Sequence, residues 1–251
     1  MEFSLGTLVF LFGVALIAGW VDTLAGGGGL LTVPALLLTG MPPASAIATN
    51  KLQGSCGTLV ATTYFLKQGA IQFRTIRWLV LTTFLGSVIG SWLVLKSNTE
   101  FLVRALPILL VLVGCYVLMS PNIDDTDKRH TVSLPIFAIS AAPTLGFYDG
   151  FFGPGTGSFI ALSLVTLCGY GLSKATANAK ILNFTSNFSS LLYFILFGQI
   201  VWIVGGVMII GQAIGAAIAA RMVMKVGAAL IKPIVVTVCF LMAIRIFWQT
   251  L

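Results

Sequence analysis

The chain has 251 residues, of which 58 % are hydrophobic and only 8 % are charged, and its mean hydropathy is +1.04. A water-soluble domain carries about 25 % charged residues, so this composition excludes an ordinary soluble globule. The longest stretch without a charged residue runs from Ile181 to Ala220. Because about 20 helical residues cross a hydrocarbon core about 30 Å thick, this stretch alone can hold two spans. The composition predicts an all-α polytopic protein of the lipid bilayer.

The formal net charge is +7. In a membrane protein we attribute such an excess to cytoplasmic loops, which retain Lys and Arg. The basic stripe interleaved with aromatic residues that is typical of nucleic-acid binding is absent from the sequence. No two of the four cysteines have metal-ligand spacing. We therefore expect no nucleic-acid partner, no metal and no cofactor.

The sequence repeats itself. The first segment contains Gly19-Trp20-Val21-Asp22 before Gly26–Gly29, and 127 residues later Gly146-Phe147-Tyr148-Asp149 precedes Gly153-Pro154-Gly155-Thr156. Further on, the offset is 129 residues, as in the matches of Lys51 with Lys180, Tyr64 with Tyr193, Gly69 with Gly198 and Gly86 with Gly215. Agreement at so many spaced positions predicts two homologous halves: residues 1–120, a cytoplasmic linker loop at 121–131, and residues 132–251.

Each half divides into five apolar segments. The predicted segments are 5–24, 29–40, 46–66, 78–95 and 102–119, then 132–152, 156–170, 176–197, 200–220 and 233–248. The segments 29–40 and 156–170 are too short for a clean membrane span. The sequence thus predicts about eight full transmembrane helices plus two short or interrupted segments.

Loop charges indicate how the halves are oriented. The loop after Tyr64 carries Lys67, Arg74 and Arg77 without an acid, whereas its counterpart, Gly198-Gln199, is uncharged. The next pair of loops shows the opposite contrast, because 96–104 mixes charges while 221–232 is purely basic. Basic loops lie in the cytoplasm, so we expect inverted repeats with the chain ends outside. Four crossings per half would instead give parallel repeats, which conflicts with these charges.

The two glycine-rich turns are candidate ligand sites. Gly27 and Gly28 in one half, and Gly155 with Thr156 in the other, precede short apolar segments. A bent backbone followed by a helix N-terminus exposes N–H groups and a partial positive charge, which favours anions. Such glycines also allow close packing of membrane helices. Their occurrence at matched positions favours the binding site.

Lys51 and Lys180 stand within apolar segments at matched positions. A charge at the bilayer centre costs at least ~2.5–3.5 kcal/mol, so it usually faces a cavity or a partner. The alternative is that both side chains reach the membrane interface. The equally matched Asp22 and Asp149 could pair with these lysines, cap the glycine turns, or take up and release protons. Pairing or capping is the favoured role.

Amide side chains flank both lysines. The residues predicted to complete a substrate site are Asn50, Gln53, Asn178 and Asn183. Amides in membrane helices also serve as interhelical contacts, which is the more common role.

The two motif pairs resemble the TauE/SafE family, and in particular its YfcA-type members. The resemblance rests on Gly19–Gly29 followed by Pro34 and Ala48–Gln53, and on Gly146–Gly153 followed by Ala175–Lys180, and it covers essentially the whole chain. Membership implies a multi-pass protein of the cell inner membrane. It also implies a role in moving sulfite or organosulfur anions such as sulfoacetate. The family supplies no catalytic residues to carry over.

The leading hypothesis is a secondary transporter of a small anion, with proton coupling as an option. Inverted repeats with interrupted helices are the recurring plan of such proteins. An intramembrane enzyme is an alternative, although the sequence has no Gly-x-Ser-x-Gly or His-Glu-x-x-His motif. A channel or a scaffold protein is the third hypothesis. A homo-oligomer is a possible assembly.

Overall fold

The computed structural model describes residues 3–98, 100–102, 104–105, 108, 112, 126–127, 129 and 131–226. Every regular element in these residues is helical. The predicted segment 233–248 lies outside the described residues, as do most of segment 102–119 and most of the linker 121–131.

The first half contributes four described helices, which are α1 (Leu5–Ala25), α2 (Gly29–Leu38), α3 (Pro43–Lys67) and α4 (Phe73–Lys96). Their boundaries follow local chemistry. The Ser4 hydroxyl caps α1 by accepting the N–H of Thr7 at 3.2 Å. Proline opens α3, where the missing N–H costs no intrahelical bond.

The second half contributes α6 (Leu134–Ile139), α7 (Ala141–Phe151), α8 (Thr156–Thr166), α9 (Leu172–Phe197) and α10 (Trp202–Val226). The sequence predicted one continuous segment over 132–152, and this prediction was wrong. The helix breaks at Ser140, between α6 and α7. The cause is Pro143, which cannot donate an N–H to the carbonyl of Ile139 and whose ring crowds that carbonyl.

The protein is a multi-pass membrane protein. Three described helices are long and apolar enough to cross a membrane, namely α1, α4 and the Trp202–Met222 part of α10. The helices α3 and α9 have 25 and 26 residues, but many polar side chains are buried along them. The predicted count of eight full spans remains a prediction.

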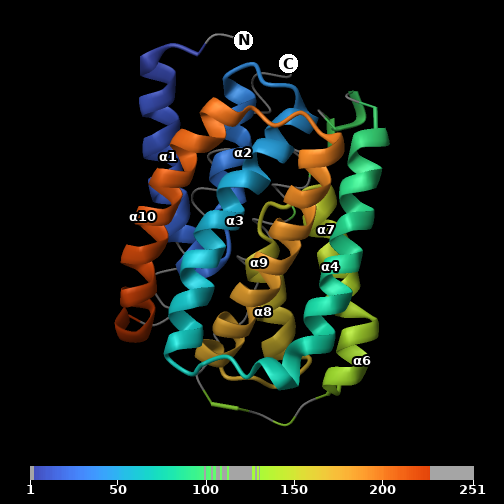
Figure 1. The fold of residues 1–251 in the computed structure, drawn as a ribbon. Helices are drawn as coiled ribbons and strands as arrows, with labels where there is room; N and C mark the ends of the chain where they lie inside the picture. Colours follow the sequence, from blue (N-terminus) through green and yellow to red (C-terminus); the bar gives the residue numbers. More distant parts are fainter. Residues whose placement is uncertain are drawn as a thin grey trace.

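The helices α3 and α9 lie in the middle of the molecule (Figure 1). On one side α1 packs against α10, and on the other α4 packs against α7. These two outer pairs correspond in the repeat. Gly19 of α1 faces the backbone of Gln212 in α10, just as Gly146 of α7 faces the backbone of Thr83 in α4. A Cβ at either glycine would collide with that backbone, so both close helix contacts require glycine.

The short helices α2 and α8 fold back on the helices that precede them. The C-terminal part of α2 packs with Leu8 and Leu11 near the start of α1, so α2 runs opposite to α1. The end of α8 similarly packs with the α6 residues Leu134 and Phe137. Both helix breaks therefore lie well inside the molecule.

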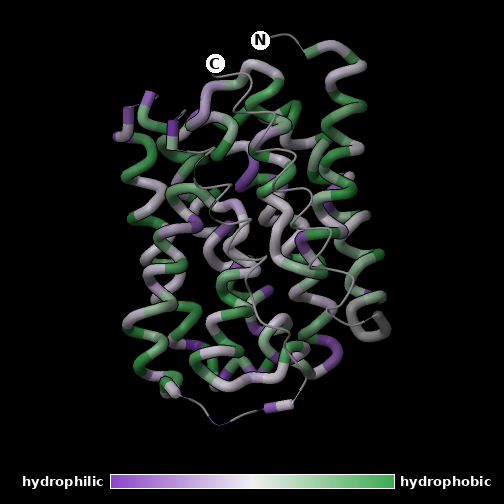
Figure 2. Tube along the Cα trace, turned by 180° about the vertical axis from the view of Figure 1, so that it is seen from behind, coloured by the Kyte–Doolittle hydropathy of each residue, from purple (hydrophilic) through white to green (hydrophobic). Residues whose placement is uncertain are grey.

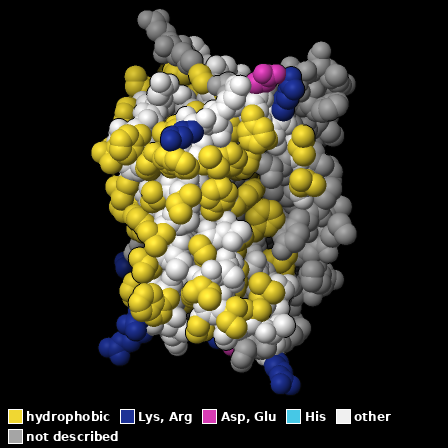
Figure 3. Space-filling model, turned by 90° about the vertical axis from the view of Figure 1, so that its right-hand side faces the viewer, with side chains coloured by type: hydrophobic (Ala, Val, Ile, Leu, Met, Phe, Trp, Pro, Cys, Tyr) yellow, Lys and Arg dark blue, Asp and Glu magenta, His cyan; other side chains and the backbone are white. Residues whose placement is uncertain are grey.

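The outer surface suits a lipid environment. Figure 3 shows hydrophobic and uncharged side chains over most of one face, with Lys, Arg and acidic side chains near its ends. Exposed apolar residues occur along each apolar spanning helix, for example Val9, Leu85 and Ile210. In Figure 2 the hydrophilic parts of the trace lie in the interior of the helix bundle as well as at its ends. The interior thus holds the polar residues that a lipid-facing surface excludes.

Candidate functional site

The two helix breaks are built by glycines in the left-handed region. Helix α1 ends at Gly26, whose φ is 78°, and α2 begins three residues later. After α7, Gly153 has a φ of 91° and Gly155 a φ of 80°, and α8 follows directly. L-residues with a side chain adopt such angles only with strain, so the sharp turns depend on glycine.

The two breaks contact each other. The N–H of Ser158, at the start of α8, donates to the carbonyl of Gly26 at 3.3 Å, and the Ser158 hydroxyl donates to the carbonyl of Ala25. A Cβ at Gly26 would collide with the backbone of Gly157. The first turns of α2 and α8 therefore meet near one place in the protein interior.

Lys51 of α3 pairs with Asp149 of α7. The distance from Lys51 Nζ to Asp149 Oδ2 is 2.8 Å, and the two side chains are 0 % and 2 % exposed. Gly153 allows the Lys51 ammonium to reach Asp149. A Cβ on residue 153 would occupy the space next to this ammonium, and glycine has none. A lysine of the first half thus meets the carboxylate beside the break in the second half.

Lys180 of α9 pairs in the opposite sense with Asp22 of α1. Its Nζ lies 3.3 Å from Asp22 Oδ2 and also donates to the backbone carbonyl of Asp22. The other carboxylate oxygen, Oδ1, accepts the N–H of Gly28 at 3.1 Å. Asp22 therefore both pairs with a lysine and holds the glycine turn. The two ion pairs cross between the halves in both directions.

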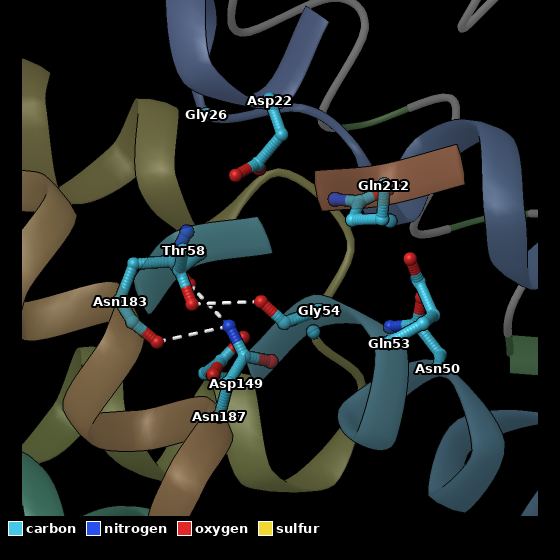
Figure 4. A pocket seen from close by; sticks show the side chains of 12 residues that line it. Asp22, Gly26, Asn50, Gln53, Gly54, Thr58, Asp149, Asn183, Asn187 and Gln212 are labelled. Atoms are coloured by element: carbon cyan, nitrogen blue, oxygen red, sulfur yellow. Dashed lines mark hydrogen bonds between the residues drawn. The ribbon is translucent and has the colours of Figure 1, made fainter. Parts of the chain in front are cut away.

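A polar cavity lies between these pairs (Figure 4). Its lining comes from both breaks and from α3, α9 and α10, and comprises Asp22, Gly26, Gly29, Asn50, Gln53, Gly54, Thr58, Asp149, Gly153, Asn183, Asn187 and Gln212. Both halves of the chain supply residues. With the two ion pairs closed, the remaining side chains that line the cavity are neutral amides and a hydroxyl.

The predicted site residues divide into three groups. Asn50, Gln53 and Asn183 line the cavity together with the two aspartates. Lys51 and Lys180 are fully buried and act on the cavity through the aspartates. The remaining predicted residues, Gly27, Gly28, Asn178, Gly155 and Thr156, lie outside the lining.

Two of these outer residues make contacts that explain their position. Asn178 turns its amide to the carbonyl of Lys174, at 2.8 Å. The Thr156 hydroxyl bonds the carbonyl of Gly153, also at 2.8 Å, and so holds the turn before α8. Both side chains support local structure and do not reach the cavity.

Gln212 is a cavity residue that sequence reasoning missed. Its side chain is 2 % exposed, and its Oε1 has no hydrogen-bond partner in the part of the chain that the structure describes. Gly57, on the facing helix α3, leaves the space that the Gln212 side chain occupies. A glutamine in the middle of the longest charge-free stretch of the chain was the feature that could have indicated it.

The closed ion pairs set the electrostatics of the site. Two ammonium groups and two carboxylates cancel in formal charge at the described distances. Breaking a buried pair by removing one partner is costly, about 3–5 kcal/mol, because the other charge is left uncompensated. The helices α2 and α8 begin directly after the two breaks, so the partial positive charge of their N-termini lies at the breaks.

The chain resembles proteins named as probable membrane transporters over nearly its whole length. A family model for the sulfite exporter TauE/SafE matches residues 11–246. A probable membrane transporter protein of Haemophilus influenzae is 46 % identical, covering 99 % of this chain and 98 % of the relative. The probable membrane transporter protein YfcA of Escherichia coli is also 46 % identical, covering 96 % and 89 %. Probable membrane transporter protein ORF9 of Sinorhizobium is 42 % identical, covering 95 % and 92 %. The chain belongs to the TauE/SafE family of membrane transporters.

Proposed function

We propose that this protein is a secondary transporter that moves a small anion across the inner membrane. The observation that carries the proposal is the reciprocal pairing of Lys51 with Asp149 and of Lys180 with Asp22 around one polar cavity. Secondary transporters place their substrate near the midplane, between two repeats and beside interrupted helices. The cavity of this protein is likewise lined by residues of both halves and by both helix breaks.

The substrate we propose is sulfite, a sulfonate or another organosulfur anion. The amide groups of Asn50 and Asn183 line the cavity, and Gly29, the first residue of α2, brings the N-terminus of that helix to it. Donors of this kind at a helix N-terminus favour oxyanions. The family description names sulfite, which supports the sulfur oxyanion class for this chain.

Proton coupling follows from the closed ion pairs. An ammonium that is already paired with a carboxylate adds little attraction for a second anion. If Asp149 takes up a proton, Lys51 loses its partner and its charge becomes available to the substrate. The same holds for Asp22 and Lys180. We therefore propose that a proton on either carboxylate accompanies the bound anion.

The proposal includes inverted repeats over residues 1–120 and 132–251, joined by a cytoplasmic linker at 121–131. The course of the helices supports it, since α3 and α9 run in opposite directions in the centre of Figure 1. The buried clusters agree, because Ala61 and Phe65 in the last turns of α3 belong to the same apolar cluster as Ala175 and Ala177 in the first turns of α9. Parallel repeats would place corresponding central helices in the same direction.

Transport by the purified chain in liposomes tests the function. We expect saturable uptake of sulfite or a sulfonate that depends on the protein, and loss of most of this flux in Lys51→Ala and Lys180→Ala. Lys174→Ala is the matched control, because Lys174 is half exposed and pairs with Asp127 outside the cavity. Normal flux in both cavity variants would contradict the role of the lysines.

The other hypotheses give different readouts in the same experiment. A channel would conduct without saturation, and an intramembrane enzyme would convert the added compound into a chemical product. A scaffold would move no solute. Absence of flux for every sulfur oxyanion and sulfonate would contradict the proposed substrate class.

A further inference from the structure

The carboxamide groups of Gln53 and Gln212 line the cavity but take no part in its two ion pairs. Both side chains line the cavity and are 1 % and 2 % exposed. Within the described residues, the Oε1 atoms of both have no hydrogen-bond partner. Buried polar atoms are almost always paired, so two such oxygens in one small cavity point to a missing partner.

The Gln53 amide is oriented by its neighbours. Its Nε2 donates to Asn50 Oδ1 at 2.7 Å, and the same oxygen accepts the Thr32 hydroxyl at 2.5 Å. The amide nitrogen of Gln53 is therefore engaged within the protein, which leaves its oxygen as the group available to a ligand. An acceptor oxygen is satisfied by a ligand that donates a hydrogen bond.

Gln212 brings a second amide to the same region from a different helix. Its side chain lies over Gly57 of α3, which is one helical turn beyond Gln53. In Figure 4, Asn50, Gln53 and Gln212 occupy one side of the view and Asn183, Asn187 and Thr58 the other. The repeat partners of Gln53 and Gln212 are Leu182 and Thr83, and neither carries an amide. The pair of amides therefore has no counterpart at the positions that the repeat relates to it.

We propose that Gln53 and Gln212 select an anion that also carries a hydrogen-bond donor, such as a hydroxylated sulfonate or a protonated oxyanion. This inference rests on the proposed transport function and specifies its substrate class. The anionic group would face the helix N-termini, and its hydroxyl would donate to the two glutamine oxygens. A metal cation could also satisfy such oxygens, and the two aspartates that line the cavity would favour one. Each carboxylate is already paired with a buried ammonium group, so the partial positive charge of the α2 N-terminus is left to favour an anion.

The test compares two sulfonates that differ in a single donor. The sodium salts of 2-hydroxyethanesulfonate and ethanesulfonate are titrated against the purified full chain, with affinity measured calorimetrically and thermal stabilisation measured in parallel. Both compounds are fully ionised, and the cation is the same. We expect the hydroxylated compound to bind about fivefold more tightly or better, which corresponds to one buried acceptor left unpaired by the analogue.

The variant Gln212→Leu should bring the ratio of the two affinities close to one. Gln199→Leu is the matched control, because Gln199 is exposed in the loop before α10, and it should keep the wild-type ratio. The ratio is internal to each variant, so a general loss of folding would abolish binding of both compounds and be recognised as such. Gln53→Leu then provides a second, independent variant with the same expected loss of preference.

The outcomes separate the inference from the proposed function. Equal binding of both sulfonates to the wild type would overturn the donor preference and leave anion transport standing. Binding of neither compound would overturn the proposed substrate class together with this inference. Stabilisation by sodium chloride that equals the stabilisation by either sulfonate would overturn the inference in favour of a cation site.

Discussion

Lys51 Nζ lies 2.8 Å from Asp149 Oδ2, and this contact joins the third helix of the first half to the helix break of the second. Lys180 and Asp22 make the corresponding contact in the other direction, at 3.3 Å. The two pairs therefore tie each half to the other at the polar cavity. A change in one pair must alter both the contact between the halves and the charge that faces a bound solute.

The first prediction separates stability from transport at this contact. Lys51→Ala leaves the Asp149 carboxylate buried without a partner, and we expect a loss of about 3–5 kcal/mol in unfolding free energy. The double variant Lys51→Ala/Asp149→Asn removes the orphaned charge and should recover most of this stability, measured by thermal unfolding in detergent. Sulfite flux should remain lost in both.

The exposed pair of Lys174 with Asp127, at 2.7 Å, is the control for this prediction. Solvent-exposed pairs contribute about 0–1 kcal/mol, so Lys174→Ala should leave stability and flux nearly unchanged. Recovery of flux in the double variant would contradict a direct role for the charged pair in transport.

The second prediction concerns the glycine that admits the lysine. Gly153→Ala introduces a Cβ at a φ of 91° and against the Lys51 ammonium. Left-handed conformation alone costs about 1–2 kcal/mol for a residue with a side chain. Gly40→Ala is a matched control, since Gly40 has a φ of 80° with open space around its Cβ position. We expect both variants to lose stability, Gly153→Ala the more because of the contact with Lys51, and only Gly153→Ala to lose flux.

The sequence indicated which residues belong to the candidate site better than it indicated which of them contact each other. The matched pattern identified both lysines, both aspartates and three cavity amides, because buried charges and polar groups stand out in apolar segments. It could not indicate that Lys51 meets Asp149 and not Asp22. That choice depends on how α3 packs against α7, which no local pattern encodes.

The break at Ser140 and the cavity residue Gln212 were not predicted, and each has a specific cause. The break at Ser140 results from Pro143, but proline also occurs inside α2 at Pro34 without ending that helix, so proline alone does not locate a break. Gln212 was overlooked because it lies far along the chain from both lysine motifs, whereas Gln53 stands two residues after Lys51. The closeness of α1 to α10, which positions Gln212, arises from backbone contacts at Gly19 and Gly215.

The third prediction concerns proton movement. With Asp149 and Asp22 as the proton carriers, sulfite entry into liposomes should acidify the lumen, as measured with an enclosed pH-sensitive dye. In Asp149→Asn/Asp22→Asn neither position can bind or release a proton, so a pH gradient should no longer drive accumulation of the anion. Accumulation that still follows the gradient would assign coupling to other groups.

The fourth prediction concerns the connection before α9. The backbone N–H of Gly171, with the Lys174 ammonium, holds the pKa of the Asp127 carboxyl below its ordinary value. A lowered pKa means that the ionised form stabilises the fold above the ordinary pKa and that this contribution is lost as the pH falls through the lowered pKa. Hydrogen exchange at the Gly171 amide, corrected for its intrinsic rate, should therefore become faster on acidification. Asp127→Ala, which removes the acceptor, should show fast exchange at every pH.

The last prediction tests the orientation of the halves by labelling introduced cysteines in intact cells. Gln68 follows α3 and Gln199 follows α9, and both side chains are exposed. In an inverted arrangement these corresponding loops lie on opposite sides of the membrane, with the basic loop after α3 in the cytoplasm. A membrane-impermeant maleimide should label Gln199→Cys in intact cells and Gln68→Cys only after permeabilisation, above the background of the parent chain. Labelling of both positions from the same side would contradict the proposed inversion of the halves.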